Sequence, residues 1–174
     1  MTALEESEVA VPIISAIVER TAGAAKKEIL LQTRIAKYDK LYNGSIEIPA
    51  GRIGAFENVY ETIKREVKEE TGLDVIEIIP NEKSKIFTSG RSDASFAFQP
   101  YCCQQLLKGN IPWIGFVFIA RVTEGKLKPA RDETKDLRWT TIEELRKLVN
   151  DTPEKMFTLQ LPVLDFYLKQ QKTA

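Results

Sequence analysis

The chain has 174 residues, in which 25 basic side chains are balanced by 25 acidic ones. A chain of this length suits a single domain over residues 1–174, and we expect residues 1–9 to form a flexible arm. The even charge excludes a general attraction to nucleic acid or to an anionic membrane, and no apolar run approaches the roughly 20 residues that span a bilayer. The N-terminus lacks a signal-peptide pattern, so we expect a cytoplasmic protein.

Histidine is absent, and the two cysteines, Cys102 and Cys103, are adjacent. Adjacent cysteines suit neither a loop-closing disulfide nor a zinc site built from separated pairs, so we interpret both as reduced strand or core residues. Without histidine, the usual general base and the usual transition-metal ligand are both missing. Any catalysis must therefore come from carboxylates, Lys, Arg, Tyr or Cys.

Hydrophobic patterning predicts strands over residues 11–20, 27–36, 46–54, 75–79, 113–122 and 136–141, with one or two more between 86 and 107. Helical periodicity predicts a central helix over 58–71, a second helix over 142–149 and a helical tail over 153–171. Strands thus bracket a central helix, and helices close the chain. This order predicts an α/β fold with a mixed sheet between helices.

The central helix has clear start and stop signals. Asn58 can cap it, Glu61 stands at the capping-box position, and Gly72 supplies the left-handed residue that ends it. At about 100° per residue, Val59 and Ile63 share one face, which must point into the core.

Acidic residues occupy an unusual place on this helix. Glu66 and Glu70 project within about 40° of the line through Val59 and Ile63, and Glu69 lies just beyond Glu66. Acidic residues on a helix usually form a solvated cluster paired with basic neighbours, but this register places them beside the apolar face. Carboxylates there repel each other and lose hydration, so they either share protons or hold a cation. Mg²⁺ or Mn²⁺ suits such an all-oxygen ligand set.

Residues 51–73 read GRIGAFENVYETIKREVKEETGL, which is a glycine, five residues, Glu57, seven residues and then REVKEETGL. This stretch resembles the complete signature of the Nudix hydrolases, from Gly51 to Leu73. The resemblance implies the Nudix α/β/α sandwich with a mixed β-sheet between helices. It also implies metal-dependent hydrolysis of the diphosphate linkage in a nucleoside diphosphate derivative, with Mg²⁺ or Mn²⁺ as cofactor.

The resemblance also implies roles for individual residues. Glu66, Glu69 and Glu70 match the metal-binding glutamates, and Gly51 matches a glycine whose neighbourhood offers a backbone carbonyl to the metal. The other matching positions have structural roles, in holding the loop against the helix or in ending the helix: Glu57, Arg65 and Gly72.

We call the signature from Gly51 to Leu73 the Nudix box. The general base stays open between a glutamate of this box and a glutamate from a later loop. In the stretch ARDETKDLRW the later candidate is Glu133, and Asp132 and Asp136 are close enough to compete. A solvated charged loop is the alternative interpretation of all three. One of Glu66, Glu69, Glu70 and Glu133 is therefore expected to take a proton from water.

Two arginines are candidates for binding phosphate, because a guanidinium matches phosphate oxygens in a fork. They are Arg52, directly after Gly51, and Arg34, at the end of the second predicted strand. Several aromatic side chains could stack on a base or pack in the core: Phe87, Phe96, Phe98, Tyr101 and Trp113. The stretch IEIPAGR resembles the family branch that acts on ADP-ribose and sugar nucleotides rather than on nucleoside triphosphates.

Two other functional classes stay open. A prenyl diphosphate isomerase shares the fold and uses a cysteine with a glutamate, and a non-catalytic nucleotide sensor typically loses box glutamates. The intact box and the adjacent cysteines argue against both. The expected partner is a small-molecule nucleoside diphosphate, and a homodimer fits the resemblance because many relatives dimerise.

Overall fold

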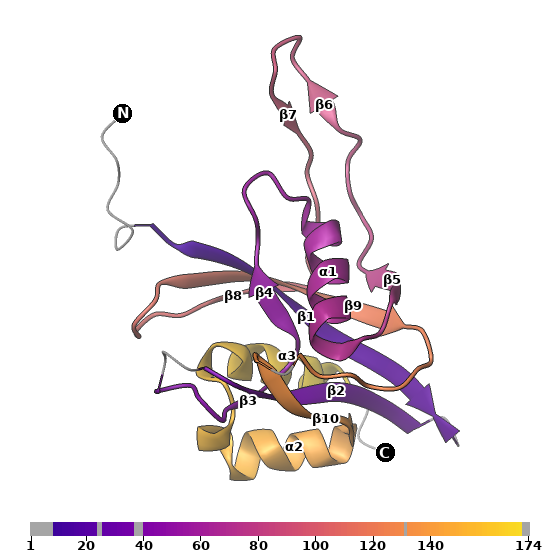
Figure 1. Cartoon of the computed structure of the whole chain (residues 1–174), viewed down its shortest axis with the longest axis vertical. Helices are drawn as coiled ribbons and strands as arrows, with labels where there is room; N and C mark the ends of the chain where they lie inside the picture. Colours follow the sequence, from indigo (N-terminus) through magenta and orange to yellow (C-terminus); the bar gives the residue numbers. More distant parts are fainter. Residues whose placement is uncertain (1–8, 24–25, 37–39, 131, 172–174) are drawn as a thin grey trace.

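The computed structural model describes residues 9–23, 26–36, 40–130 and 132–171. All of the arm predicted for residues 1–9, except Val9, lies outside the described residues. In the described part, the main sheet has eight strands and runs in the order β10-β2-β1-β9-β5, with β3 on β2, β4 on β1 and β8 on β9 (Figure 1). The strands of this sheet are β1 Val11–Ala22, β2 Lys26–Arg34, β3 Ile46–Glu47, β4 Ala50–Arg52, β5 Val75–Ile79, β8 Cys102–Gln105, β9 Trp113–Val122 and β10 Thr134–Thr141.

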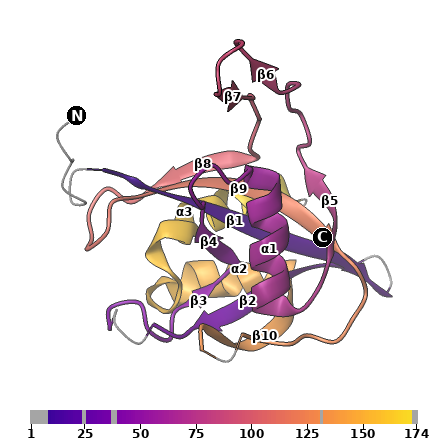
Figure 2. The same ribbon diagram turned by 45° about the horizontal axis from the view of Figure 1, so that its top comes forward.

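Helices cover both faces of this sheet (Figure 2). One face carries α1 (Val59–Thr71), and the other carries α2 (Ile142–Asp151) and α3 (Leu161–Gln170). Strands β1 and β9 run parallel, whereas the other pairs of the sheet are antiparallel. The structure therefore has the mixed sheet between helices that the sequence predicted. None of the helices in the described ranges combines the length and apolarity needed to span a membrane.

Two layers of core hold the sandwich together. Side chains of β1 alternate between them, since Ile14, Ala16 and Val18 pack under α1 and Ile17 packs under α3. The layer beneath α1 includes Val59 and Ile63 of the helix, as its periodicity predicted, together with Val67.

The ends of α1 follow its sequence signals in part. The Asn58 side chain accepts a hydrogen bond from the Tyr60 amide at 2.9 Å, and Gly72 ends the helix at φ 78°. The Asn58 side chain bonds to the Tyr60 amide rather than to that of Glu61, and the Glu61 side chain pairs with Lys64 at 2.9 Å, so the predicted capping box does not form at this helix. At the start of α2 a capping box does form, because the side chains of Thr141 and Glu144 each accept a hydrogen bond from the other residue's backbone amide.

The main sheet splits at its centre, where β1 and β2 separate. Strands β1 and β2 pair through Glu19–Ala22 and Lys26–Ile29, and beyond these residues they separate. The segment of residues 46–52 fills the gap, because β3 pairs with β2 and β4 pairs with β1. The single strand predicted for residues 46–54 is therefore wrong, since the chain changes its pairing partner between Glu47 and Ala50.

A buried glutamine stabilises this break. The Ile48 amide donates to Oε1 of Gln160 at 2.8 Å, and Nε2 of Gln160 donates to the Ile48 carbonyl at 3.1 Å. Both backbone groups of Ile48 are thus satisfied without a strand partner.

Two other stretches differ in detail from the prediction. Residues 86–107 contain β8 and a separate hairpin, β6 (Phe87–Thr88) with β7 (Ala94–Ser95), which projects from the body of the molecule (Figure 1). The tail is not one helix but the 3₁₀ turns η3 (Pro153–Lys155) and η4 (Thr158–Gln160) followed by α3. Pro162 lies in the first turn of α3, where a missing amide hydrogen costs nothing, so the helix begins there.

Candidate active site

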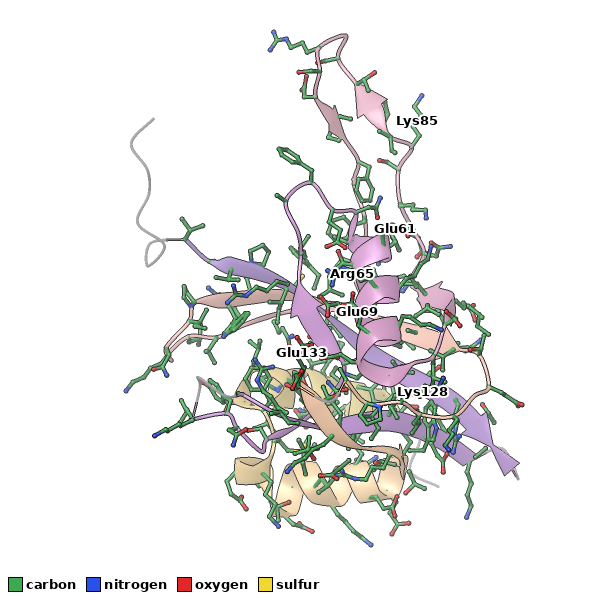
Figure 3. All side chains as sticks on the ribbon, viewed as in Figure 1. Glu61, Arg65, Glu69, Lys85, Lys128 and Glu133 are labelled. Atoms are coloured by element: carbon green, nitrogen blue, oxygen red, sulfur yellow. The ribbon has the colours of Figure 1, made fainter. Side chains whose placement is uncertain are left out.

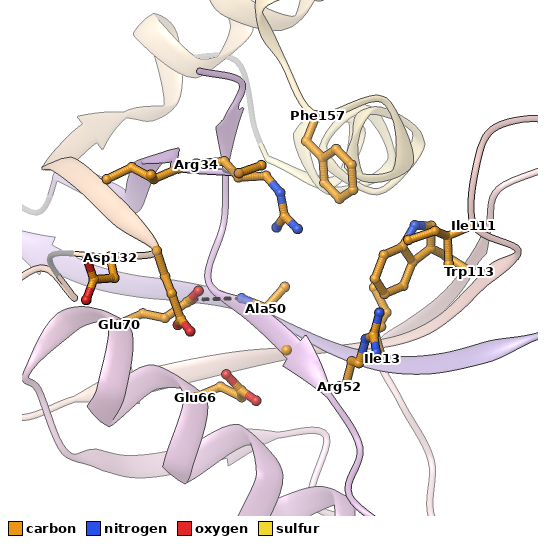
Figure 4. Close-up of a pocket in the computed structure, with 14 residues that line it drawn as sticks. Ile13, Arg34, Ala50, Arg52, Glu66, Glu70, Ile111, Trp113, Asp132 and Phe157 are labelled. Atoms are coloured by element: carbon orange, nitrogen blue, oxygen red, sulfur yellow. Dashed lines mark hydrogen bonds between the residues drawn. The ribbon is translucent and has the colours of Figure 1, made fainter. Parts of the chain in front are cut away.

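A cavity of about 510 Å³ lies where the sheet divides (Figure 4). Four acidic and two basic side chains line it, together with an apolar wall. The acidic residues are Glu66, Glu70, Asp132 and Glu133; the basic residues are Arg34 and Arg52; the wall includes Ile13, Ile111, Trp113 and Phe157. The cavity therefore gathers predicted residues from α1, β2, β4 and the segment before β10.

Glu70 is the most enclosed of the acidic residues. It is 4% exposed, and its Oε2 atom accepts hydrogen bonds from the Gln32 side chain at 2.9 Å and from the Ala50 amide at 3.0 Å. Burial raises the pKa of Glu70 well above its usual value, and the neighbouring Glu47 carboxylate raises it further. The same burial would favour a bound cation, because a positive charge offsets the lost hydration.

Glu66 lies against the backbone of β4. A Cβ atom at Gly51 would overlap its carboxylate, so the glycine creates the space that this side chain fills. Arg65 donates to Oε1 of Glu66 at 2.6 Å. Burial nevertheless raises the pKa of Glu66, and the charges of Glu69 and Glu133 act in the same direction.

Glu69 does not join the other two glutamates in the cavity. Its side chain is 55% exposed and accepts a hydrogen bond from Arg65 at 3.2 Å (Figure 3). The structure thus brings together two of the three predicted metal-binding glutamates, and Gly51, the fourth predicted ligand, also lines the cavity. Among the described residues, no three side chains of metal-binding type are gathered closely enough to form a site by themselves. The metal-ligand atoms that Glu66 and Glu70 offer are carboxylate oxygens, which Mg²⁺ and Mn²⁺ prefer. Backbone oxygens or water would have to complete the coordination.

Arg65 and Glu57 join the loop after β4 to the helix. The Arg65 guanidinium meets the Glu57 carboxylate in a fork, at 2.8 Å from Nε and 2.9 Å from Nη2. Hydrogen bonding from Arg65, and then from the Gly54 amide, lowers the pKa of Glu57 to about 2. Arg65 also donates to the Arg52 carbonyl at 3.3 Å. The guanidinium therefore connects the loop, β4 and the carboxylates of α1.

Glu133 stands directly before β10, with its side chain exposed at the cavity. Its carbonyl accepts a hydrogen bond from the Ile35 amide at 2.7 Å, which fixes the backbone beside the end of β2. Its charge contributes to the raised pKa of Glu66, so the two carboxylates interact. Asp132 lines the same cavity, whereas Asp136 lies on β10 and does not.

The two arginines lie against aromatic rings. The Arg34 guanidinium is 5.4 Å from the ring centre of Phe157, and the Arg52 guanidinium is 5.5 Å from that of Trp113. Arg34 also pairs with Glu47 at 3.3 Å. Both rings are buried, so they position the cations rather than offering open faces for stacking.

A family model for the NUDIX domain matches residues 10–160. The chain belongs to the Nudix family. It is 28% identical to putative nudix hydrolase 1 of Caenorhabditis elegans over 137 residues, which is 77% of this chain. The chain spans about 30% of the length of that relative.

Solved Nudix structures share the fold. The MutT protein of Methanosarcina mazei superposes with a TM-score of 0.66 at 16% identity, covering 98% of this chain and all of that one. The Nudix domain of Shewanella oneidensis NrtR, solved with ADP ribose, gives a TM-score of 0.62 at 12% identity, covering 93% and 88% of the two chains. The predicted family and the Nudix α/β/α fold are confirmed, and the matched relatives support the prediction of a hydrolase.

Three residues at or beside the cavity were not predicted from the sequence. Gln32 and Glu47 lie buried beside Glu70, and burial raises the pKa of Glu47 to about 7. The one available signal was a lone acidic residue inside the apolar run Ile46-Glu47-Ile48. Phe157 comes from the tail, and no local pattern linked it to the cavity.

Few of the aromatic candidates reach the Nudix site. Of the five, Trp113 lines the cavity. Phe96 and Phe98 pack in the core with Tyr60 and Phe118, as the core interpretation expected. The remaining two are Tyr101, against α3, and Phe87, exposed on the hairpin.

The cysteines are both free, as predicted. They lie on β8, with Cys102 partly buried and Cys103 exposed. Neither lines the cavity.

Proposed function

We propose that this Nudix protein is a divalent-metal-dependent hydrolase that cleaves the diphosphate linkage of a nucleoside diphosphate derivative. The observation that carries the proposal is the pair of enclosed carboxylates, Glu66 and Glu70, in a cavity that also presents Arg34 and Arg52. Buried carboxylates attract a cation, and guanidinium groups attract phosphate oxygens. One cavity therefore offers carboxylates for a metal and guanidinium groups for a diphosphate.

The charge balance around Glu70 supports a cation. Glu47 and Glu70 are both buried, and Arg34 forms an ion pair with Glu47 at 3.3 Å. When both carboxylates are ionised, two buried negative charges with one cation leave an unfavourable excess of negative charge. Glu66 and Glu70 would hold Mg²⁺ or Mn²⁺ with backbone oxygen near Gly51, and Glu69 would join only after turning from Arg65. When bound, such an ion would supply positive charge that offsets the charge of the diphosphate and lowers the pKa of water.

The side chains of the cavity have separate tasks in this proposal. Arg34 and Arg52 bind and orient the phosphate groups. A carboxylate takes the proton from the attacking water, and Glu133 suits this task because it is exposed at the cavity and interacts with Glu66. The glutamates of the Nudix box, Glu66, Glu69 and Glu70, are its competitors.

We favour ADP-ribose or a sugar nucleotide over a nucleoside triphosphate. The stretch IEIPAGR supports this substrate class, and the structural neighbour from Shewanella oneidensis was solved with ADP ribose in the same fold. A cavity of about 510 Å³ has room for a small molecule of this kind. The cytoplasmic location and the homodimer stay predictions.

The test is a screen of dinucleotides, sugar nucleotides and nucleoside triphosphates with Mg²⁺ or Mn²⁺, in which a coupled phosphatase releases phosphate from the products. We expect turnover of a sugar nucleotide or ADP-ribose, its loss in EDTA, and its loss in Glu70→Gln with the fold intact. Turnover in Glu70→Gln at the wild-type rate would contradict the metal assignment. An unchanged pH–rate profile in Glu133→Gln would remove that residue from the mechanism.

The isomerase alternative predicts a catalytic cysteine. Because Cys102 and Cys103 lie outside the cavity, replacing both by alanine should leave hydrolysis intact. Loss of activity in a folded double variant would favour the isomerase. Release of a nucleoside monophosphate by the wild-type protein would exclude a non-catalytic sensor.

A further inference from the structure

A row of polar side chains connects Arg34 to Glu70, both of which line the cavity. Nη1 of Arg34 lies 3.3 Å from Oε2 of Glu47, Oε1 of Glu47 lies 3.4 Å from Nε2 of Gln32, and the same Nε2 lies 2.9 Å from Oε2 of Glu70. We call these four residues the Gln32 relay. Gln32 and Glu47 stand directly opposite each other in the β2–β3 pair, so the backbone register fixes their contact.

Gln32 is the centre of the relay and is fully buried. Its amide nitrogen faces two carboxylates, which is the favourable orientation because the amide oxygen would repel both. Burial leaves no water to replace the two hydrogen bonds if the side chain were lost. Gln32 therefore holds together two groups that would otherwise separate by mutual repulsion.

The two carboxylate oxygens of Glu70 differ in the hydrogen bonds that they accept. Oε2 accepts from Gln32 and also from the Ala50 amide at 3.0 Å (Figure 4). Within the described part of the chain, no hydrogen bond to Oε1 is found. The carboxylate is thus fixed through one oxygen, and the other stays available to a ligand in the cavity.

We propose that Gln32 and Glu47 are positioning residues, which hold the Glu70 carboxylate ready for the divalent metal and connect its orientation to Arg34. This inference rests on the proposed function, since it assigns the metal to Glu70 and the phosphate to Arg34. Residues that orient a metal ligand through hydrogen bonds typically change metal affinity or activity by about 10–100-fold when they are replaced.

The test compares Gln32→Met with Gln104→Met by calorimetric titration of Mn²⁺ into the full chain without substrate. Gln104 is a matched control, because it is also buried, donates one hydrogen bond to Ser15 at 3.0 Å, and has an Oε1 atom without a partner, as Gln32 does. Methionine keeps the length and removes the donors in both cases. We expect Mn²⁺ to bind about 10–100-fold more weakly to Gln32→Met and with unchanged affinity to Gln104→Met.

Turnover gives a second measurement. We expect Gln32→Met to regain most of its kcat at high Mn²⁺, because the ligand is misplaced rather than missing. A variant with no more than a packing defect would show unchanged Mn²⁺ affinity together with a lower melting temperature.

The outcomes separate the two proposals. Absence of Mn²⁺ binding by the wild-type protein would overturn the metal-dependent function and this inference together. Wild-type binding with equal affinity in folded Gln32→Met would overturn the inference alone. If Gln32→Met does not fold, Glu47→Gln decides, since it keeps the shape and removes a buried charge. Weaker Mn²⁺ binding and a higher KM are expected there, and no change in either would refute the relay.

Discussion

Replacing Gly51 by alanine should disable the site without unfolding the protein. A Cβ atom at this position would lie 1.8 Å from the carboxyl carbon of Glu66. Non-bonded carbons need about 3.5 Å, so the carboxylate must retreat by about 1.7 Å. Gly51 has no positive φ, so alanine adds no backbone strain. Because a misplacement of about 1 Å can cost about 100-fold in rate, we expect kcat to fall by at least that factor.

The assay measures kcat at saturating metal and substrate, together with thermal unfolding. Gly23→Ala is the control, since a Cβ atom there meets nothing within 4 Å and Gly23 also has no positive φ. We expect both variants to melt near the wild-type temperature and Gly51→Ala alone to lose turnover. Wild-type kcat in Gly51→Ala would refute the claim that the position of the Glu66 carboxylate controls catalysis.

Three further predictions concern charge. The pKa of Glu47 is raised from 4.5 to about 7, so the stability that this group contributes is complete below pH 4.5 and is lost as the pH rises through 7. Between acidic and alkaline pH, the unfolding free energy of the wild type should therefore fall by about 3 kcal/mol more than that of Glu47→Gln, measured by urea denaturation in EDTA. Free Mn²⁺ at about 100 times its Kd should raise the wild-type unfolding free energy by about 2.7 kcal/mol, and that of Glu70→Gln much less. Arg34→Lys should raise KM about tenfold with kcat little changed, because lysine lacks the planar fork that rests on Phe157; an unchanged KM would remove Arg34 from substrate binding.

Local signals predicted the helix of the site well. The burial of Ile63 and Glu70 follows from the helical period, and Gly72 ends the helix as its conformational freedom suggested. Glu69 shows the limit of such reasoning. It lies one position from Glu70, yet Arg65 holds it at the surface, and a helical angle alone does not reveal that partner.

The rest of the site depends on pairing between distant segments. Gln32 meets Glu47 only because β2 and β3 are in register, and both approach Glu70 only because α1 packs on that part of the sheet. Phe157 reaches Arg34 from the extended connection between η3 and η4, more than 100 residues away in the sequence. No periodicity within one stretch of sequence predicts these long-range contacts, whereas the family was already indicated by the short motif.

The divided sheet has a consequence for how specificity can change. The strands β1, β4 and β9 form one wall of the cavity and carry Ile13, Arg52 and Trp113. The opposite wall contains Arg34 and Phe157. The hydrogen bonds of Gln160 to Ile48 fix the junction, so main-chain geometry sets the span between the two walls. Lining side chains can therefore be exchanged to admit a different leaving group while the frame that carries the carboxylates keeps its dimensions.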